Sequence, residues 1–184
     1  PSTIYGMLLS LVGEENRDKH QGAEIALALL SEPELSTILR TLWRIRFAKV
    51  PLGVGSNARP DYQELLTDIR LVLWLRKGQE KEGFSLFERV RSALEEPSSI
   101  RRFGGLSLGE STHLINDLRP WREEDGLSAQ ILIGCPEGEL ALPIWVDHVG
   151  SKHTVWKQFS LVVGELNQAP PPEAWSTITS TANV

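Results

Sequence analysis

The sequence predicts one α+β domain with a ferredoxin-like βαββαβ order, from which the first strand is missing. Its 184 residues are enough for one packed domain, and 41% hydrophobic with 23% charged residues is an ordinary globular composition. Helix-type and strand-type apolar spacings follow in the order helix, strand, loop, strand, helix, glycine loop, strands. Because this order begins with a helix, we expect the opening strand to lie upstream of Pro1.

The first 33 residues favour two helices. Ser2 precedes apolar residues spaced three and four positions apart, which predicts a helix over 3–12 that ends at Gly13. A segment rich in alanine and leucine at 23–30 favours a second, short helix, because both residue types have high helix propensity. Pro33 ends this helix.

The middle of the chain predicts a long, basic, protruding hairpin over about residues 40–75. Apolar and cationic residues alternate over 42–48, which is typical of a strand with one cationic face. Glycine, serine and asparagine make 51–60 a loop. A continuous apolar run at 69–75 is typical of a strand that is covered on both faces.

A helix and a glycine-rich loop follow the hairpin. Ser85 and Glu88 form a capping box that starts a helix running to about Glu95. Arg101 and Arg102 then stand just before a segment with three glycines in six residues, where backbone amides can turn outward. Such a loop can hold a phosphate group.

Three short apolar runs predict a C-terminal β extension. They lie at 131–133, 140–146 and 155–163, and Pro143 makes the second of them an edge or bulged strand. We assign residues 1–168 to the folded domain. Residues 169–184 are rich in proline, serine and threonine, and we expect them to form a poorly ordered tail.

Charge is segregated along the chain, although the formal net charge is only −5. Between Glu34 and Asp61 there are five cationic residues and no acidic one. Between Glu96 and Glu110 there are two arginines and again no acidic residue. Two basic segments in an acidic body favour a bounded site for a polyanion, although runs of one sign also arise by chance on any charged surface.

Several other function classes receive little support. The single cysteine excludes an internal disulfide and a cysteine-rich zinc site, and it fits a reducing, cytosolic compartment. No apolar run is long enough for a membrane-spanning helix. A match to G-x-S-x-G around Ser107 lacks the preceding strand that a hydrolase needs. Asp147, His148 and His153 have no common metal-ligand spacing, so we expect loop residues there.

The aromatic residues have two possible roles. We assign Trp43, Trp74 and Trp145 to core packing because they stand in strand patterns, and we favour the same role for Trp121 and Trp156, for which an interface is the alternative. Tyr5 and Tyr62 could each stack on an unpaired base, although core packing is the simpler role of Tyr5.

Three segments resemble the CRISPR-associated Cas-five family. The first-helix motif of that family is similar to residues 1–9 (PSTIYGMLL). Its DevS-type branch is similar to residues 44–49 (RIRFAK) through 57–68 (NARPDYQELLTD), and its glycine-rich motif to residues 103–111 (FGGLSLGES). The resemblance covers about residues 1–165, and the long middle block is its most specific part.

This resemblance implies a RAMP subunit of a type I Cascade surveillance complex, with an RRM-like fold and a protruding thumb hairpin. Such a subunit binds and caps the 5′ handle of the CRISPR RNA, contacts the large subunit and the first backbone subunit, and works close to target DNA in the prokaryotic cytoplasm. In RNA-guided complexes the guide supplies sequence specificity by base pairing. We therefore expect binding without catalysis, and no metal, cofactor or membrane contact.

We assign RNA binding to cationic, aromatic and loop residues: Arg44, Arg46, Lys49, Arg59, Tyr62, Arg101, Arg102, Gly104, Gly105 and Ser107. The resemblance implies an apolar thumb tip made of Val50, Pro51, Leu52, Gly53 and Val54. One alternative is a metal-independent endoribonuclease that processes precursor RNA, using Tyr5, Lys49 and His113. A second alternative is a structural bridging subunit whose basic face meets an acidic protein.

Overall fold

The computed structural model describes the chain except for residues 44–48, 51–54, 103, 149–151 and 182–184. The described residues form two compact units. One comprises residues 1–30 and 71–184, and the other comprises residues 31–70.

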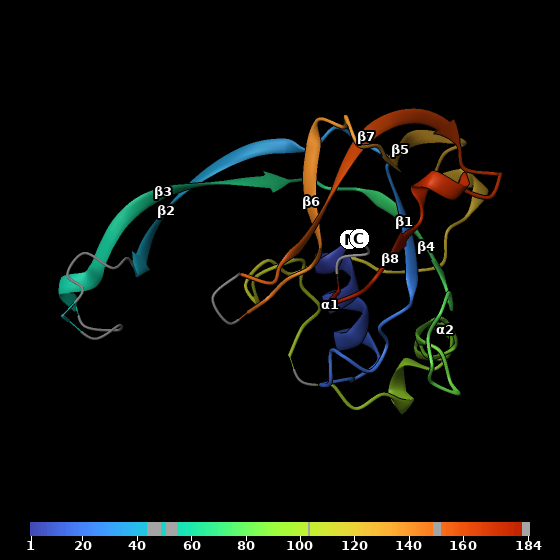
Figure 1. Cartoon of the computed structure of the whole chain (residues 1–184), viewed down its shortest axis with the longest axis horizontal. Helices are drawn as coiled ribbons and strands as arrows, with labels where there is room; N and C mark the ends of the chain where they lie inside the picture. The colour runs from blue at the N-terminus through green and yellow to red at the C-terminus, as the bar shows by residue number, and fades with distance from the viewer. Residues whose placement is uncertain (44–48, 51–54, 103, 149–151, 182–184) are drawn as a thin grey trace. The chain divides into compact units, whose positions relative to one another are not determined.

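The larger unit is an antiparallel sheet with α1 (Ser2–Leu11) and α2 (Leu86–Glu95) beside it (Figure 1). Among the described residues its sheet has six strands, in the order β4-β1-β5-β7-β6, with β8 paired to β1. The strands are β1 (Glu24–Leu29), β4 (Leu71–Arg76), β5 (Ser128–Gly134), β6 (Leu140–Trp145), β7 (Val155–Glu165) and β8 (Ser176–Thr177). This confirms the predicted α+β class, whereas the ferredoxin-like order stays a prediction.

The segment predicted as a second helix is strand β1 instead, so this prediction was wrong. Every residue of β1 is paired with β4, from Glu24 opposite Arg76 to Leu29 opposite Leu71. Ile25 packs in the cluster beneath the helices, while Ala26 and Ala28 lie in the cluster on the other face. A site that is covered on both sheet faces selects small and branched apolar residues, and this packing overrides the helix propensity of alanine.

Helix α1 ends as predicted, whereas its start differs, because Ser2 is its first residue and not its N-cap. Its buried face contributes Ile4, Leu8 and Leu11 to the main core. After C-cap Val12, the amide of Gly13 donates to the carbonyl of Ser10, and the amide of Glu14 donates to that of Leu9. This is the Schellman pattern, and Gly13 has the left-handed φ of +64° that the pattern requires.

Helix α2 begins with the predicted capping box. The hydroxyl of Ser85 accepts from the amide of Glu88, and the carboxylate of Glu88 accepts from the amide of Ser85 at 2.7 Å. Leu86, Val90 and Ala93 are buried against α1 and the sheet. The capping residues therefore fix where α2 starts, and its apolar side fixes which face it presents to the core.

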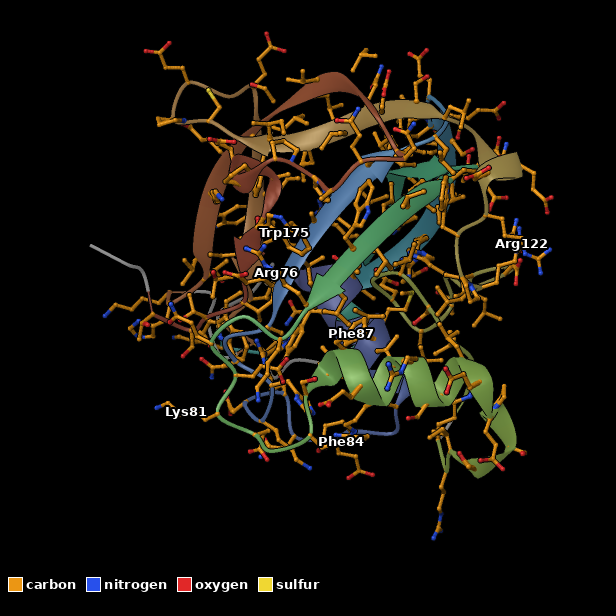
Figure 2. All side chains as sticks on the ribbon, turned by 90° about the vertical axis from the view of Figure 1, so that its right-hand side faces the viewer. Arg76, Lys81, Phe84, Phe87, Arg122 and Trp175 are labelled. Atoms are coloured by element: carbon orange, nitrogen blue, oxygen red, sulfur yellow. The ribbon has the colours of Figure 1, made fainter. Side chains whose placement is uncertain are left out.

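The C-terminal segment is packed, so the expectation of poor order was wrong for its described part. β8 pairs with Glu24 and Ile25 of β1, and Ile178 is fully buried. The guanidinium of Arg76 lies 4.0 Å from the ring centre of Trp175; both side chains are labelled in Figure 2. The proline and serine composition concealed this packing because a few spaced residues, Pro170, Ala174, Ser176 and Ile178, are the buried ones.

The tryptophans divide between core and surface. Trp145 is buried beside Tyr5, and the guanidinium of Arg17 lies 4.0 Å from the centre of its ring. Trp74 and Trp121 are partly buried in the second core cluster, as expected. Trp156 is 60% exposed on β7, so its assignment to the core was wrong.

The smaller unit is a two-stranded hairpin of β2 (Glu34–Trp43) and β3 (Ala58–Thr67), with the 3₁₀ turn Gly55–Asn57 before β3. The predicted hairpin of about 40–75 is therefore shifted. The return strand begins at Ala58 rather than 69, and the apolar run at 69–75 contributes to β4 of the main sheet.

Within β6, Pro143 coincides with a shift in the register to β7, and β6 ends the strand order of the sheet, which confirms the predicted edge or bulged strand. No helix among the described residues is long and apolar enough to cross a membrane.

Candidate nucleic-acid interface

Two of the predicted cationic residues lie near the turn that joins the two strands of the hairpin. Lys49 and Arg59 are both exposed. Asn57 is fully buried, and its amide nitrogen donates to the carbonyl of Val50 at 3.1 Å. This bond ties the two chain segments together at the turn, so the exposed cations stand on a connected framework.

One face of the hairpin carries two exposed apolar pairs, which were not predicted from the sequence and which the polar pair of Thr37 and Glu64 separates. Leu35 pairs with Leu66, and Leu39 pairs with Tyr62, so these four apolar side chains share one face. They are 64%, 60%, 63% and 73% exposed, respectively. Exposed apolar groups gathered on one face commonly mark an interaction surface. We call this set the hairpin stripe.

The other face of the hairpin is mixed in chemistry and less exposed. Arg40 donates to the side chain of Gln63 at 2.8 Å and stands opposite Asp61 in the register, and Ile38 and Leu65 lie on this face as well. The two faces thus differ in exposure more than in polarity.

The glycine-rich segment forms a separate feature of the larger unit. Arg101 and Arg102 are exposed, and Gly104 follows with a left-handed φ of +72°. The chain then closes a small loop in which Ser107 bridges Leu114. The amide of Leu108 donates to the carbonyl of His113 at 3.0 Å, and Gly109 has a φ of +92°.

Two further glycines in and near this segment allow close approach. A Cβ atom at Gly105 would lie 2.8 Å from the Leu114 side chain. A Cβ at Gly13 would lie only 2.3 Å from the carbonyl oxygen of Arg101. The end of α1 therefore supports the backbone that carries the two arginines.

A buried polar network links the end of α1 to α2. His20 and the Glu80 side chain are fully buried, with Nδ1 of His20 2.6 Å from Oε2 of Glu80. Nη1 of Arg89 lies 2.9 Å from Nε2 of His20. Since a guanidinium can only donate, Nε2 accepts and Nδ1–H donates to Glu80. Glu80 also accepts from the amide of Leu86 at the start of α2.

Arg89 extends this network to the end of α1. It donates to Oε2 of Glu14 at 2.5 Å and to the carbonyl of Val12 at 3.0 Å. Lys19 donates to the same Glu14 oxygen at 2.8 Å. Partial burial opposes the charge on Glu14, but these two cations outweigh it and lower the pKa of this carboxyl to about 2.

The residues considered for RNA cleavage have different surroundings. Tyr5 is buried, its hydroxyl donates to the carbonyl of Arg17 at 2.7 Å, and burial raises its pKa well above the usual value. Tyr5 therefore has a structural role. His113 is partly buried in the turn, and Lys49 belongs to the hairpin unit. Asp147 accepts from the amide of His153, and the residues that the structure describes contain no cluster of metal-binding side chains.

The predicted RNA-binding residues thus fall into two groups. Lys49, Arg59 and Tyr62 are exposed on the hairpin unit. The larger unit carries exposed Arg101, Arg102, Gly104 and Gly105 with partly buried Ser107. Val50 of the expected thumb tip is partly exposed. The remaining predictions lie outside the described residues: Arg44, Arg46, Pro51, Leu52, Gly53 and Val54.

The fold is similar to that of a solved protein chain. A solved chain of a CRISPR RNA-guided surveillance complex matches this structure with a TM-score of 0.55 at 12% sequence identity. The match covers 89% of this chain and 78% of that chain. The chain therefore has the α+β fold of a protein found in an RNA-guided complex.

The amino-acid sequence is similar to that of a curated protein, and this similarity shows the family. The CRISPR-associated protein Cas5 of Myxococcus xanthus (strain DK1622) is 47% identical over 156 residues, which are 84% of this chain and 73% of that protein. The chain belongs to the Cas5 family of CRISPR-associated proteins, which confirms the resemblance stated from the sequence motifs. No family model matches the chain.

Proposed function

We propose that this chain is a non-catalytic subunit of a Cascade-type CRISPR surveillance complex that binds and caps the 5′ handle of the CRISPR RNA. Membership of the Cas5 family and the likeness to a surveillance-complex chain support this role. The observation that carries it is the pair of exposed arginines, Arg101 and Arg102, on a backbone that Gly104 turns by its positive φ.

The chemistry of this pair suits a phosphate backbone. The segment from Pro97 to Gly109 contains no acidic residue, so nothing within it repels an anion. Guanidinium groups bind phosphate oxygens through paired hydrogen bonds, and amides near a left-handed glycine can add donors. Single-stranded RNA with unstacked bases fits such a site better than a duplex does.

The hairpin has two roles in this proposal. Its basic end, with Lys49 and Arg59, contacts the RNA backbone, and Tyr62 offers a stacking surface for a base. The hairpin stripe packs against a neighbouring protein, for which the first backbone subunit is our candidate, while the large subunit contacts the main unit. The complex works in the prokaryotic cytoplasm, close to its target DNA.

The test is binding of a labelled CRISPR repeat RNA by the full chain, measured by gel retention over a range of salt concentrations with and without chelator. We expect the RNA to stay intact and its retention to decrease as the salt concentration rises. Replacing Arg101 and Arg102 by alanine removes two phosphate contacts, so the slope of log K against log salt should fall by about 1.4 for single-stranded RNA.

The matched control replaces Arg91 and Arg122 by alanine. Both are exposed arginines of the same unit, each with a glutamate within 4.0 Å, and Figure 2 shows Arg122. An equal loss in both double variants would contradict a site at Arg101 and Arg102. Chelator-resistant product bands that disappear in His113→Ala would establish the endonuclease alternative, and absence of retention at every salt concentration would favour the bridging alternative.

A further inference from the structure

A pocket of about 310 Å³ lies where the ends of α1 and α2 meet the glycine-rich segment. Its apolar lining includes Leu94, Leu106 and Ile115. Arg102, Asn116 and Asp117 supply its polar groups. The pocket therefore joins an apolar interior to a polar edge, directly beside one of the two proposed phosphate-binding arginines.

The size and lining suit one small planar group. Pockets for small molecules span about 300–1,000 Å³, so this one lies at the lower end and has room for a single nucleobase rather than for a larger ligand. A base buries apolar ring faces and keeps a polar edge, which matches the distribution of groups here. Arg102 is an exposed cation in the lining, so it can bind the phosphate attached to an extruded base.

Asp117 gives the pocket a preference among the bases. Its side chain is 70% exposed, and one oxygen lies 3.5 Å from Nε of Arg119, which leaves further acceptor positions on the carboxylate. Two carboxylate oxygens accept best from two neighbouring N–H donors. Guanine offers that pair, N1–H and the N2 amine, whereas the pairing edges of adenine, cytosine and uracil place an acceptor beside each donor.

We infer that this pocket receives one unpaired guanine of the bound RNA and that Asp117 accepts from its pairing edge. The inference rests on the proposed RNA binding and adds base selectivity to it. Asn116, beside Asp117, carries an amide that can donate to the guanine O6. The rival occupant is an apolar side chain of a neighbouring protein, which would make no use of the carboxylate.

The experiment uses the full chain and short fluorescein-labelled oligouridines that carry one central guanosine, adenosine or inosine, with binding followed by fluorescence anisotropy. Guanosine should bind about tenfold more tightly than adenosine, as expected for a paired contact to a base edge. Inosine should lie between them, because it keeps N1–H and lacks the N2 amine. Asp117→Asn should abolish the guanosine preference, since its amide would face a second donor.

The matched control is Glu123→Gln, which neutralises another exposed carboxylate a few residues away and outside the pocket lining. It should keep the full preference. Equal binding of all three RNAs would overturn the guanine pocket, leave the proposed function intact and favour the apolar occupant. A preference that survives Asp117→Asn would also overturn the inference, and failure to bind both these RNAs and the repeat RNA would overturn the inference together with the proposed function.

Discussion

Replacing His20 by leucine should reveal how strongly the buried network supports the larger unit. The change removes the 2.6 Å partner of Glu80 and the acceptor for Arg89, while the Glu80 side chain stays fully buried. A hydrogen bond to a charged group contributes about 1.5–3 kcal/mol. For a chain of this size each kcal/mol lowers the melting temperature by about 2–4 °C, so we expect a decrease of roughly 3–12 °C.

The assay is urea unfolding followed by circular dichroism, with thermal melts alongside. A second variant separates charge from packing, because Glu80→Gln added to His20→Leu removes the stranded charge and keeps an oxygen for the Leu86 amide. The double variant should therefore be more stable than His20→Leu alone. His148→Leu, at an exposed position, is the control. A cost below about 1 kcal/mol, or no recovery in the double variant, would refute the reasoning.

Three further predictions concern the supports of the interface. The pKa of Glu14 is depressed from 4.5 to about 2, so the stability that this carboxylate contributes is present above pH 4.5 and is lost as the pH falls towards 2. Glu14→Gln should therefore cost about 1–2 kcal/mol at neutral pH, and in acid unfolding curves its free energy of unfolding should equal that of the parent chain near pH 2. Gly13→Ala should cost about 1–3 kcal/mol in urea unfolding and weaken RNA retention, because φ at this position is +64° and the new Cβ would meet the Arg101 carbonyl. The control is Gly6→Ala, whose Cβ would have no atom within 4 Å, and it should stabilise helix α1 by up to about 1 kcal/mol. Replacing both Leu39 and Leu66 by serine should reduce self-association measured by light scattering and leave the melting temperature of the larger unit unchanged. Increased aggregation would argue against an exposed stripe.

The two helices were predictable because their signals are local. Apolar spacing defines α1, and the capping box of Ser85 and Glu88 defines the start of α2. Strand β1 was missed because its short alanine-rich sequence has helix propensity, and only pairing with β4, more than forty residues away, selects the extended form. Strand β3 was not predicted: its first residues, 58–60, fell within the loop predicted over 51–60, and the rest of it was not assigned. Its Pro60 is tolerated because both strands of a two-stranded ribbon are edges.

The candidate site was predictable where charge and glycine patterns carry it. The absence of acidic residues around Arg101 and Arg102 is visible along the chain, and both are exposed in the structure. The hairpin stripe depended on the register of β3, so alternation of Tyr62 and Leu66 would have identified it once that segment was read as a strand. The contact between His20 and Glu80 joins positions sixty residues apart, and no local pattern marks it.

The hairpin stripe has a consequence for how the protein is made. A two-stranded ribbon on its own is only marginally stable in water, and this one presents Leu35, Leu39, Tyr62 and Leu66 to solvent. On our proposal that a neighbouring protein covers the stripe, that protein would supply part of the free energy that keeps the ribbon ordered. Synthesis of this chain in excess over such a partner would then leave an exposed apolar surface in solution, so balanced production of the two would matter for solubility as well as for assembly.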